Sequence, residues 1–216
     1  MSLFVERFIL GDLATNCYVI HNGQEALLLD PALGSEELRR WIEDQNLTVR
    51  YIVNTHGHID HIGGNAFFKE AFPGALLAVH DADLLYLVRP DLNLSQEFSQ
   101  AFVSPLPDLT FQGEDAWIAL GDENVEVLQT PGHTPGSVCL FFPKKQWLFS
   151  GDTLFFGSVG RTDLPGGSFR DLVESLGKIF ERFSDGVQVF PGHGPMTDIG
   201  TERKTNAYYL MYVAQR

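Results

Sequence analysis

Three histidines and one aspartate lie within six residues of one another in the first third of the chain. The β-forming run 51–53 leads into this cluster, and two glycines follow it. Ligands one residue apart can project to the same side of a strand-to-loop turn, so His56 and His58 can bind one ion while Asp60 and His61 turn toward another. The chain has only seven histidines, and three beside an acid favour a metal site over a polar surface loop.

Strand and helix patterns alternate through the first half of the chain. The Asn22-Gly23 step between two apolar runs is typical of a β-hairpin. Capping and periodicity predict helices that begin near Ser35 and at Asn65. Predicted strands occupy residues 3–10, 16–21, 25–29, 49–53 and 75–79. Strand, helix and strand in succession form a βαβ pattern, so the fold class is predicted to be mixed α/β or α+β.

Three later strands also end in residues that bind metals. The predicted strand 125–130 is followed by His133, and the strand 146–150 is followed by Asp152. After a predicted helix over 169–183, the strand 187–190 is followed by His193. Open α/β sheets place their sites at the carboxyl ends of strands, so we expect these side chains to join the first cluster.

Together the candidates are His56, His58, Asp60, His61, His133, Asp152 and His193. Seven ligands are too many for one tetrahedral zinc and suit two ions. We expect one half of the site to contain His56, His58 and His133, the other half to contain Asp60, His61 and His193, and Asp152 to bridge them.

Two divalent cations are therefore the expected cofactors. No cysteine joins the set, so iron and manganese are candidates beside zinc. Two ions about 3.5–4 Å apart lower the pKa of a shared water, and one of them can polarise a carbonyl. Together these two effects predict a hydrolase. Asp60 and Asp152 are the expected catalytic carboxylates.

Length, net charge and cysteine content limit the class of protein and the partners that it could bind. A length of 216 residues suits one domain over 1–216, and a formal net charge of −13 argues against a nucleic-acid partner. The cysteines, Cys17 and Cys139, each lie in an apolar run, which favours burial over a disulfide. The chain has neither a signal-like start nor a run of transmembrane length, which predicts a cytoplasmic protein without a membrane partner. Both a monomer and a homodimer remain open.

Four further features have two interpretations each. Asp30, at the end of a buried strand, either supports the histidine loop or begins a turn. His80 has no partner at ligand spacing, which favours helix capping or solvent contact over metal binding. Residues 89–111 form either a covering flap or a plain connection. Residues 201–212 are predicted to form a packing helix, and a substrate or dimer surface is the alternative.

The sequence resembles the metallo-β-lactamase superfamily. Residues 55–61 read Thr-His-x-His-x-Asp-His, and His133, Asp152 and His193 follow at later strand ends. The resemblance covers essentially the whole chain and implies a four-layer αβ/βα sandwich with the site at one edge, between two sheets. Zinc β-lactamases usually have cysteine where this chain has Asp152, which argues against hydrolysis of β-lactam antibiotics.

Within that superfamily, residues 151–161 and 191–197 resemble glyoxalase II, the hydroxyacylglutathione hydrolases, and above all their small single-domain relatives. The resemblance implies hydrolysis of a small-molecule thioester such as S-D-lactoylglutathione by a metal-bridging hydroxide. No separate C-terminal glutathione-binding domain, as in the larger enzymes, is expected, and Pro195 stands where those enzymes have a tyrosine. Arg161 occupies the position of a basic glutathione contact, and an ion pair with Asp163 is the alternative.

Other activities of this superfamily remain as alternatives. Residues 160–163, Gly-Arg-Thr-Asp, also resemble the iron-dependent glutathione persulfide dioxygenases, whereas Gly194-Pro195 favours the hydrolases. A phosphodiesterase or nuclease would need a basic face, which the net charge does not favour. A non-catalytic metal-binding module is the remaining alternative.

Overall fold

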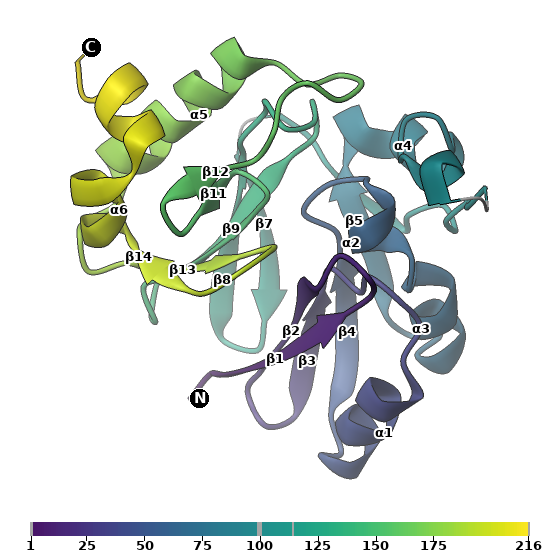
Figure 1. The fold of residues 1–216 in the computed structure, drawn as a ribbon. Coiled ribbons are helices and arrows are strands. Elements are labelled where there is room, and N and C mark those ends of the chain that lie inside the picture. Colours follow the sequence, from purple (N-terminus) through teal and green to yellow (C-terminus); the bar gives the residue numbers. More distant parts are fainter. Residues whose placement is uncertain (1, 99–100, 114, 216) are drawn as a thin grey trace.

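The computed structural model describes residues 2–98, 101–113 and 115–215. In this part of the chain, two six-stranded sheets pack face to face, with helices on the outer face of each (Figure 1). The N-terminal half supplies one sheet and the C-terminal half supplies the other.

The first sheet has the strand order β1-β2-β3-β4-β5-β6. Its strands are β1 (Phe4–Leu10), β2 (Thr15–His21), β3 (Glu25–Leu29), β4 (Thr48–Val53), β5 (Leu76–His80) and β6 (Leu109–Phe111). The first three strands are antiparallel, whereas β3 to β6 run parallel to one another. The parallel part follows from helical crossovers between strands, as the βαβ pattern predicted.

The second sheet has the order β14-β13-β10-β9-β8-β7. Its strands are β7 (Asp115–Leu120), β8 (Glu123–Gln129), β9 (Val138–Phe142), β10 (Trp147–Gly151), β13 (Gln188–Pro191) and β14 (Thr197–Asp198). A small hairpin of β11 (Leu154–Phe155) and β12 (Ser158–Val159) follows β10. Strands β10 and β13 are parallel because a helical crossover, which contains α5 (Phe169–Arg182), connects them.

The helices lie in two groups, one for each half of the chain (Figure 1). They are α1 (Glu36–Asp44), α2 (Ile59–Ile62), α3 (Asn65–Ala71), α4 (Leu84–Val88), α5 (Phe169–Arg182) and α6 (Ile199–Thr205). Ser35 caps α1 and Ser168 caps α5 by accepting a hydrogen bond from a backbone N–H three residues on. The predicted cap at Ser35 is therefore confirmed.

Alternation of side chains along the strands produces the four layers. Tyr18 and Ile20 of β2 point into the apolar layer between the two sheets. Their neighbours Cys17 and Val19 point outward, toward the helices that cover the first sheet. Because successive side chains of a strand face opposite sides, a sheet buried on both faces is apolar at every position. The predicted αβ/βα sandwich and the burial of both cysteines are confirmed.

One prediction of local structure differs from the structure. Residues 201–212 do not form one helix: α6 ends at Thr205, and a separate π-helical turn spans Tyr209–Val213. The Asn206 side chain interrupts the helix by accepting hydrogen bonds from the N–H groups of Tyr208 and Tyr209.

In the segment 89–111, for which a covering flap and a plain connection were the alternatives, residues 99 and 100 lie outside the described residues. The segment contains a 3₁₀ turn, Ser95–Phe98, and the sheet-edge strand β6. Across the described residues, no helix combines the length and the apolar character needed to span a membrane.

Candidate metal centre

The histidine loop joins strand β4 to helix α2. His58 precedes the first residue of α2, and Asp60 and His61 lie within that short helix. The imidazole of His61 lies beside that of His56, with 4.1 Å between the ring centroids. Gly57 lies against the fourth helix: a Cβ atom at this position would be 2.3 Å from Cβ of Tyr86. The loop therefore requires glycine at 57 in order to pack where it does.

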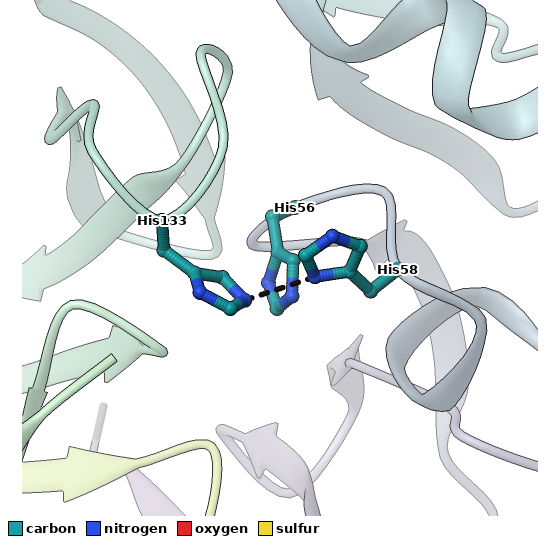
Figure 2. A group of neighbouring side chains, drawn as sticks. All are labelled: His56, His58 and His133. Carbon is teal, nitrogen blue, oxygen red and sulfur yellow. Dashed lines mark hydrogen bonds between the residues drawn. The ribbon is translucent and has the colours of Figure 1, made fainter. Parts of the chain in front are cut away.

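All seven predicted side chains lie close together, on segments that follow strands of both sheets. Their ligand atoms form three overlapping groups: His56, His58 and His133; His56, His61 and Asp152; and Asp60, His61 and His193. Figure 2 shows that the imidazoles of the first group point toward one another, although His133 comes from the loop after β8 in the opposite sheet. Nδ1 of His58 lies 2.9 Å from Nε2 of His133.

Asp152 lies between the two predicted halves. Its Oδ1 atom is 3.4 Å from Nε2 of His61, and its Oδ2 atom is 3.6 Å from Nε2 of both His133 and His193. In the second half, Oδ2 of Asp60 is 3.1 Å from Nε2 of His193. The carboxylate of Asp152 thus lies near members of both predicted halves, as its position after β10 predicted.

The donor set fits divalent cations. Nε2 of His56 and Oδ1 of Asp152 are buried without a hydrogen-bond partner in the described part of the chain. An unpaired buried polar atom costs about 1–3 kcal/mol, so such atoms at the centre of a cluster indicate a missing partner. Imidazole nitrogens and carboxylate oxygens without cysteine suit zinc, iron and manganese.

Electrostatics divides the cluster into two kinds of environment. Burial and neighbouring imidazoles, His133 first among them, lower the pKa of His58 to about 3, so this ring is in the neutral form that binds metals. Burial alone would lower the pKa of His61, but Asp30, Asp152 and Asp60 together raise it to about 10. The half that contains Asp60 therefore attracts positive charge.

The histidines are oriented by acceptors behind them. His133 donates from Nδ1 to the backbone carbonyl of Arg161 at 2.7 Å, and His193 donates from Nδ1 to that of Leu13 at 3.1 Å. Nδ1 of His61 lies 3.0 Å from Oδ2 of Asp30. Acceptors of this kind fix the tautomer that leaves Nε2 available to a metal ion.

Asp30 supports the histidine loop, and so the first of its two interpretations holds. Its carboxylate accepts hydrogen bonds from the backbone N–H of Thr55 at 2.7 Å and from the Thr55 hydroxyl at 2.8 Å. His80 caps the turn that follows β5 by accepting a hydrogen bond from the N–H of Ala82. His80 is buried, so capping holds and solvent contact does not.

Asp83 is a supporting residue that sequence reasoning missed. This fully buried carboxylate accepts hydrogen bonds from the N–H groups of Gly57 at 2.9 Å and Gly136 at 2.6 Å, and from the Thr134 hydroxyl at 2.7 Å. It therefore ties the loop of His56 and His58 to the loop of His133. Its sequence context, Asp81-Ala82-Asp83, reads only as the start of a helix.

Arg161 lies beside the cluster rather than within it. Its backbone supports His133, whereas its guanidinium forms an ion pair with Asp163 at 2.7 Å, and both side chains are exposed. The predicted ion pair is present. An exposed guanidinium remains accessible to a ligand, so the pairing does not conflict with an anchoring role.

The sequence profile described as the metallo-beta-lactamase superfamily matches residues 10–193 of the chain. The chain is 33% identical to the hydroxyacylglutathione hydrolase GloC of Haemophilus influenzae over 196 residues, which cover 89% of this chain and 92% of that protein.

Solved structures show the same fold. The chain superimposes on the BLEG-1 B3 metallo-beta-lactamase with a TM-score of 0.89 at 34% identity, covering 95% of this chain and 99% of that one. It also matches TTHA1623 in a di-iron-bound form, with a TM-score of 0.82 at 34% identity, covering 94% and 99% of the two chains.

Proposed function

Because this chain belongs to the metallo-beta-lactamase superfamily of hydrolases, we propose that it cleaves thioesters, with S-D-lactoylglutathione as the reference substrate. The observation that carries the proposal is Asp152, which lies between two clusters of imidazole and carboxylate ligands. The similarity to a hydroxyacylglutathione hydrolase over nearly the full length of both chains supports this choice of substrate class.

In this proposal each ligand set has its own role. His56, His58 and His133 would hold one divalent cation, and Asp60, His61 and His193 would hold the other. Asp152, which lies near members of both groups, would contribute to both sites. Bound ions would supply an activated water and a polarised substrate carbonyl. Zinc is the first candidate, and a relative with a di-iron form supports iron as an alternative.

Hydrolysis breaks the bond between the acyl carbon and sulfur and joins the acyl group to a water oxygen. The sulfur leaves with the electron pair as a thiolate, a good leaving group that needs no protein acid. The carboxylates Asp60 and Asp152 would orient the attacking water and would balance the positive charge of the bound ions. Arg161, exposed beside His133, would bind a carboxylate of the thiol portion.

The test is elemental analysis of the purified protein together with a thioester-hydrolysis assay. We expect two divalent ions per chain and hydrolysis of S-D-lactoylglutathione. The variant Asp152→Ala should bind one ion fewer, and its kcat/KM should be at least about a hundredfold lower. The reason is that replacing even an outer-shell partner of a metal lowers affinity or activity by about 10–100-fold. The surface variant Asp44→Ala is the control. A protein with both ions bound that hydrolyses no thioester would refute the proposal.

Two other activities have a specific observation in their favour and belong in the same assay. Asp152 argues against hydrolysis of β-lactams, whereas the likeness to a B3 metallo-beta-lactamase favours it, and a chromogenic cephalosporin measures this activity. Residues 160–163 favour persulfide oxidation, which consumes oxygen with glutathione persulfide and requires one iron. A preference of at least tenfold for either substrate over thioesters would replace the proposal.

A further inference from the structure

A cavity of about 390 Å³ opens beside the candidate metal centre. Asp60 forms part of its wall and is also a member of the second ligand group, so the cavity and the metal centre share a side chain. The rest of the wall includes Leu13, Leu33, Phe98 and Phe102. The volume lies in the usual range for small-molecule sites.

The mouth of this cavity exposes large apolar side chains. Leu13 is 48% exposed, Leu33 is 54% exposed and Phe98 is 51% exposed. A single exposed apolar side chain is ordinary, but three around one opening next to a reactive centre indicate a surface that a ligand covers.

The charges of the wall are of one sign. Asp12 and Asp60 contribute to it, and the described residues of the lining include no lysine or arginine. In the proposed site the charge of Asp60 is offset by a bound ion, so an anionic group placed in the cavity would face the carboxylate of Asp12, which is unfavourable at short range. The wall therefore suits an uncharged apolar group.

The wall is held in place by the fold. Asn93, fully buried, donates hydrogen bonds to the carbonyls of Tyr86 at 2.9 Å and Phe102 at 3.1 Å. The carbonyl of Asn93 accepts a hydrogen bond from the N–H of Ile59, the first residue of α2. Phe102 packs against the small apolar cluster that includes Ile62. The segment 89–111 is thus attached to the same short helix that carries Asp60 and His61.

The cavity lies at one end of the site. It adjoins the ligand group that contains Asp60, whereas Arg161 adjoins His133 of the other group. A thioester whose thiol portion contacts Arg161 would therefore extend its acyl portion toward the cavity.

On the basis of the proposed function, we propose that this cavity is an acyl pocket that selects thioesters with uncharged apolar acyl groups, aliphatic or aromatic. Such substrates fill the space between Leu33, Phe98 and Phe102. Short hydroxylated groups such as lactoyl leave much of it unfilled, and acyl groups that end in a carboxylate meet Asp12.

The first test is a series of glutathione thioesters that differ only in the acyl group: acetyl, lactoyl, butanoyl, hexanoyl and 3-carboxypropanoyl. We expect kcat/KM to increase by up to about fourfold for each buried methylene group. The 3-carboxypropanoyl thioester should fall at least tenfold below the butanoyl thioester. Equal rates across the series, or a maximum at lactoyl, would overturn the acyl pocket and leave the proposed function intact.

The second test uses variants of the wall. Phe98→Ala should flatten the dependence on chain length, and Asp12→Asn should reduce the discrimination against the carboxylate. Leu106→Ala is the matched control, because Leu106 lies in the same segment, is 70% exposed and does not line the cavity. A Phe98→Ala enzyme with an unchanged dependence on chain length would contradict the proposal.

A binding measurement separates the acyl pocket from the proposed function. S-hexylglutathione and S-methylglutathione are not hydrolysed, and calorimetry gives their affinities with and without added metal ions. We expect S-hexylglutathione to bind at least tenfold more tightly to the protein, and Phe98→Ala to remove most of the difference. Equal affinities would refute the acyl pocket, whereas the expected difference in a protein without thioesterase activity would refute only the proposed function.

Discussion

Asp30 combines an unusual backbone conformation with two tasks at the candidate metal centre. Its φ angle of 51° places it in the left-handed region, which aspartate and asparagine tolerate better than most residues. From there its carboxylate holds Thr55 and faces His61. Asp30, which lies 31 residues before His61 in the sequence, can thereby control the orientation of this candidate ligand.

Asp30→Asn should lower metal affinity by about 10–100-fold with little change in folding. Asparagine keeps the backbone preference and one acceptor for Thr55, but it removes the charge that faces His61. Metal competition with a chromogenic chelator measures the effect. The exposed Asn46, also left-handed at φ 54°, offers the reverse exchange Asn46→Asp as a control that should leave affinity unchanged.

Arg161→Ala should raise KM for glutathione thioesters about two- to fivefold with kcat nearly constant, because an exposed ion pair is worth about 0.2–1 kcal/mol. Steady-state kinetics checks this, and Arg170→Ala, an exposed arginine of α5, is the control. A fall in kcat alone would contradict the anchoring role.

The sequence predicted the candidate ligands because their chemistry is visible in residue type and spacing. It did not predict Asp83, because a carboxylate that ties two loops together looks the same in sequence as one that begins a helix. Its partners, Gly57 and Gly136, are far along the chain from it and are joined only by the packing of the two sheets.

At the scale of elements, helix α5 acts as a support for the loop of His133. Ser168, its cap, donates its N–H to the carbonyl of Gly132, and the Ser175 hydroxyl donates to that of Pro131. Gly132 has a φ of 141°, and a Cβ atom there would lie 2.4 Å from the backbone of Leu172. The loop and the helix are in direct contact.

Gly132→Ala should therefore displace the loop and lower the affinity for the ion proposed at His56, His58 and His133 by at least about tenfold. Titration of the metal-free variant measures this. Gly177→Ala is the control within the same helix: nothing lies near its Cβ position, so it should raise the free energy of unfolding by about 0.5–1 kcal/mol and leave metal binding unchanged.

Most strands were predictable because their apolar runs and turns are local features. The interruption of the helix at Asn206 was not predictable, because the sequence pattern of residues 201–212 continues across it. Only the hydrogen bonds that the Asn206 side chain accepts end the helix there. The attachment of segment 89–111 was also hidden, since it depends on the buried Asn93 and its distant partners.

At the scale of the whole molecule, the two halves of the chain contribute different ligands. His56 and His61 follow a strand of the first sheet, whereas His133, Asp152 and His193 follow strands of the second. The backbone also joins the sheets here, since Asn16 donates its N–H to the carbonyl of Gly192. In the proposed site, bound ions would therefore connect one sheet to the other.

Metal removal should lower the unfolding temperature by about 5–10 °C. A ligand at a hundred times its Kd stabilises the folded state by about 2.7 kcal/mol, and for a chain of this size about 1 kcal/mol corresponds to 2–4 °C. Scanning calorimetry before and after chelation, followed by addition of zinc, measures the shift. Asp152→Ala should respond less, and an equal response would show that the ions bind elsewhere.

The sharing of ligands between the sheets also has a consequence for folding. Neither half of the chain holds the proposed ligand set alone, since His133 completes a group begun by His56 and His58. Tight metal binding would therefore arise only in molecules whose halves have docked. The rate at which a refolding protein takes up metal would then report the rate at which the two halves dock. This rate is distinct from the rate at which either sheet forms.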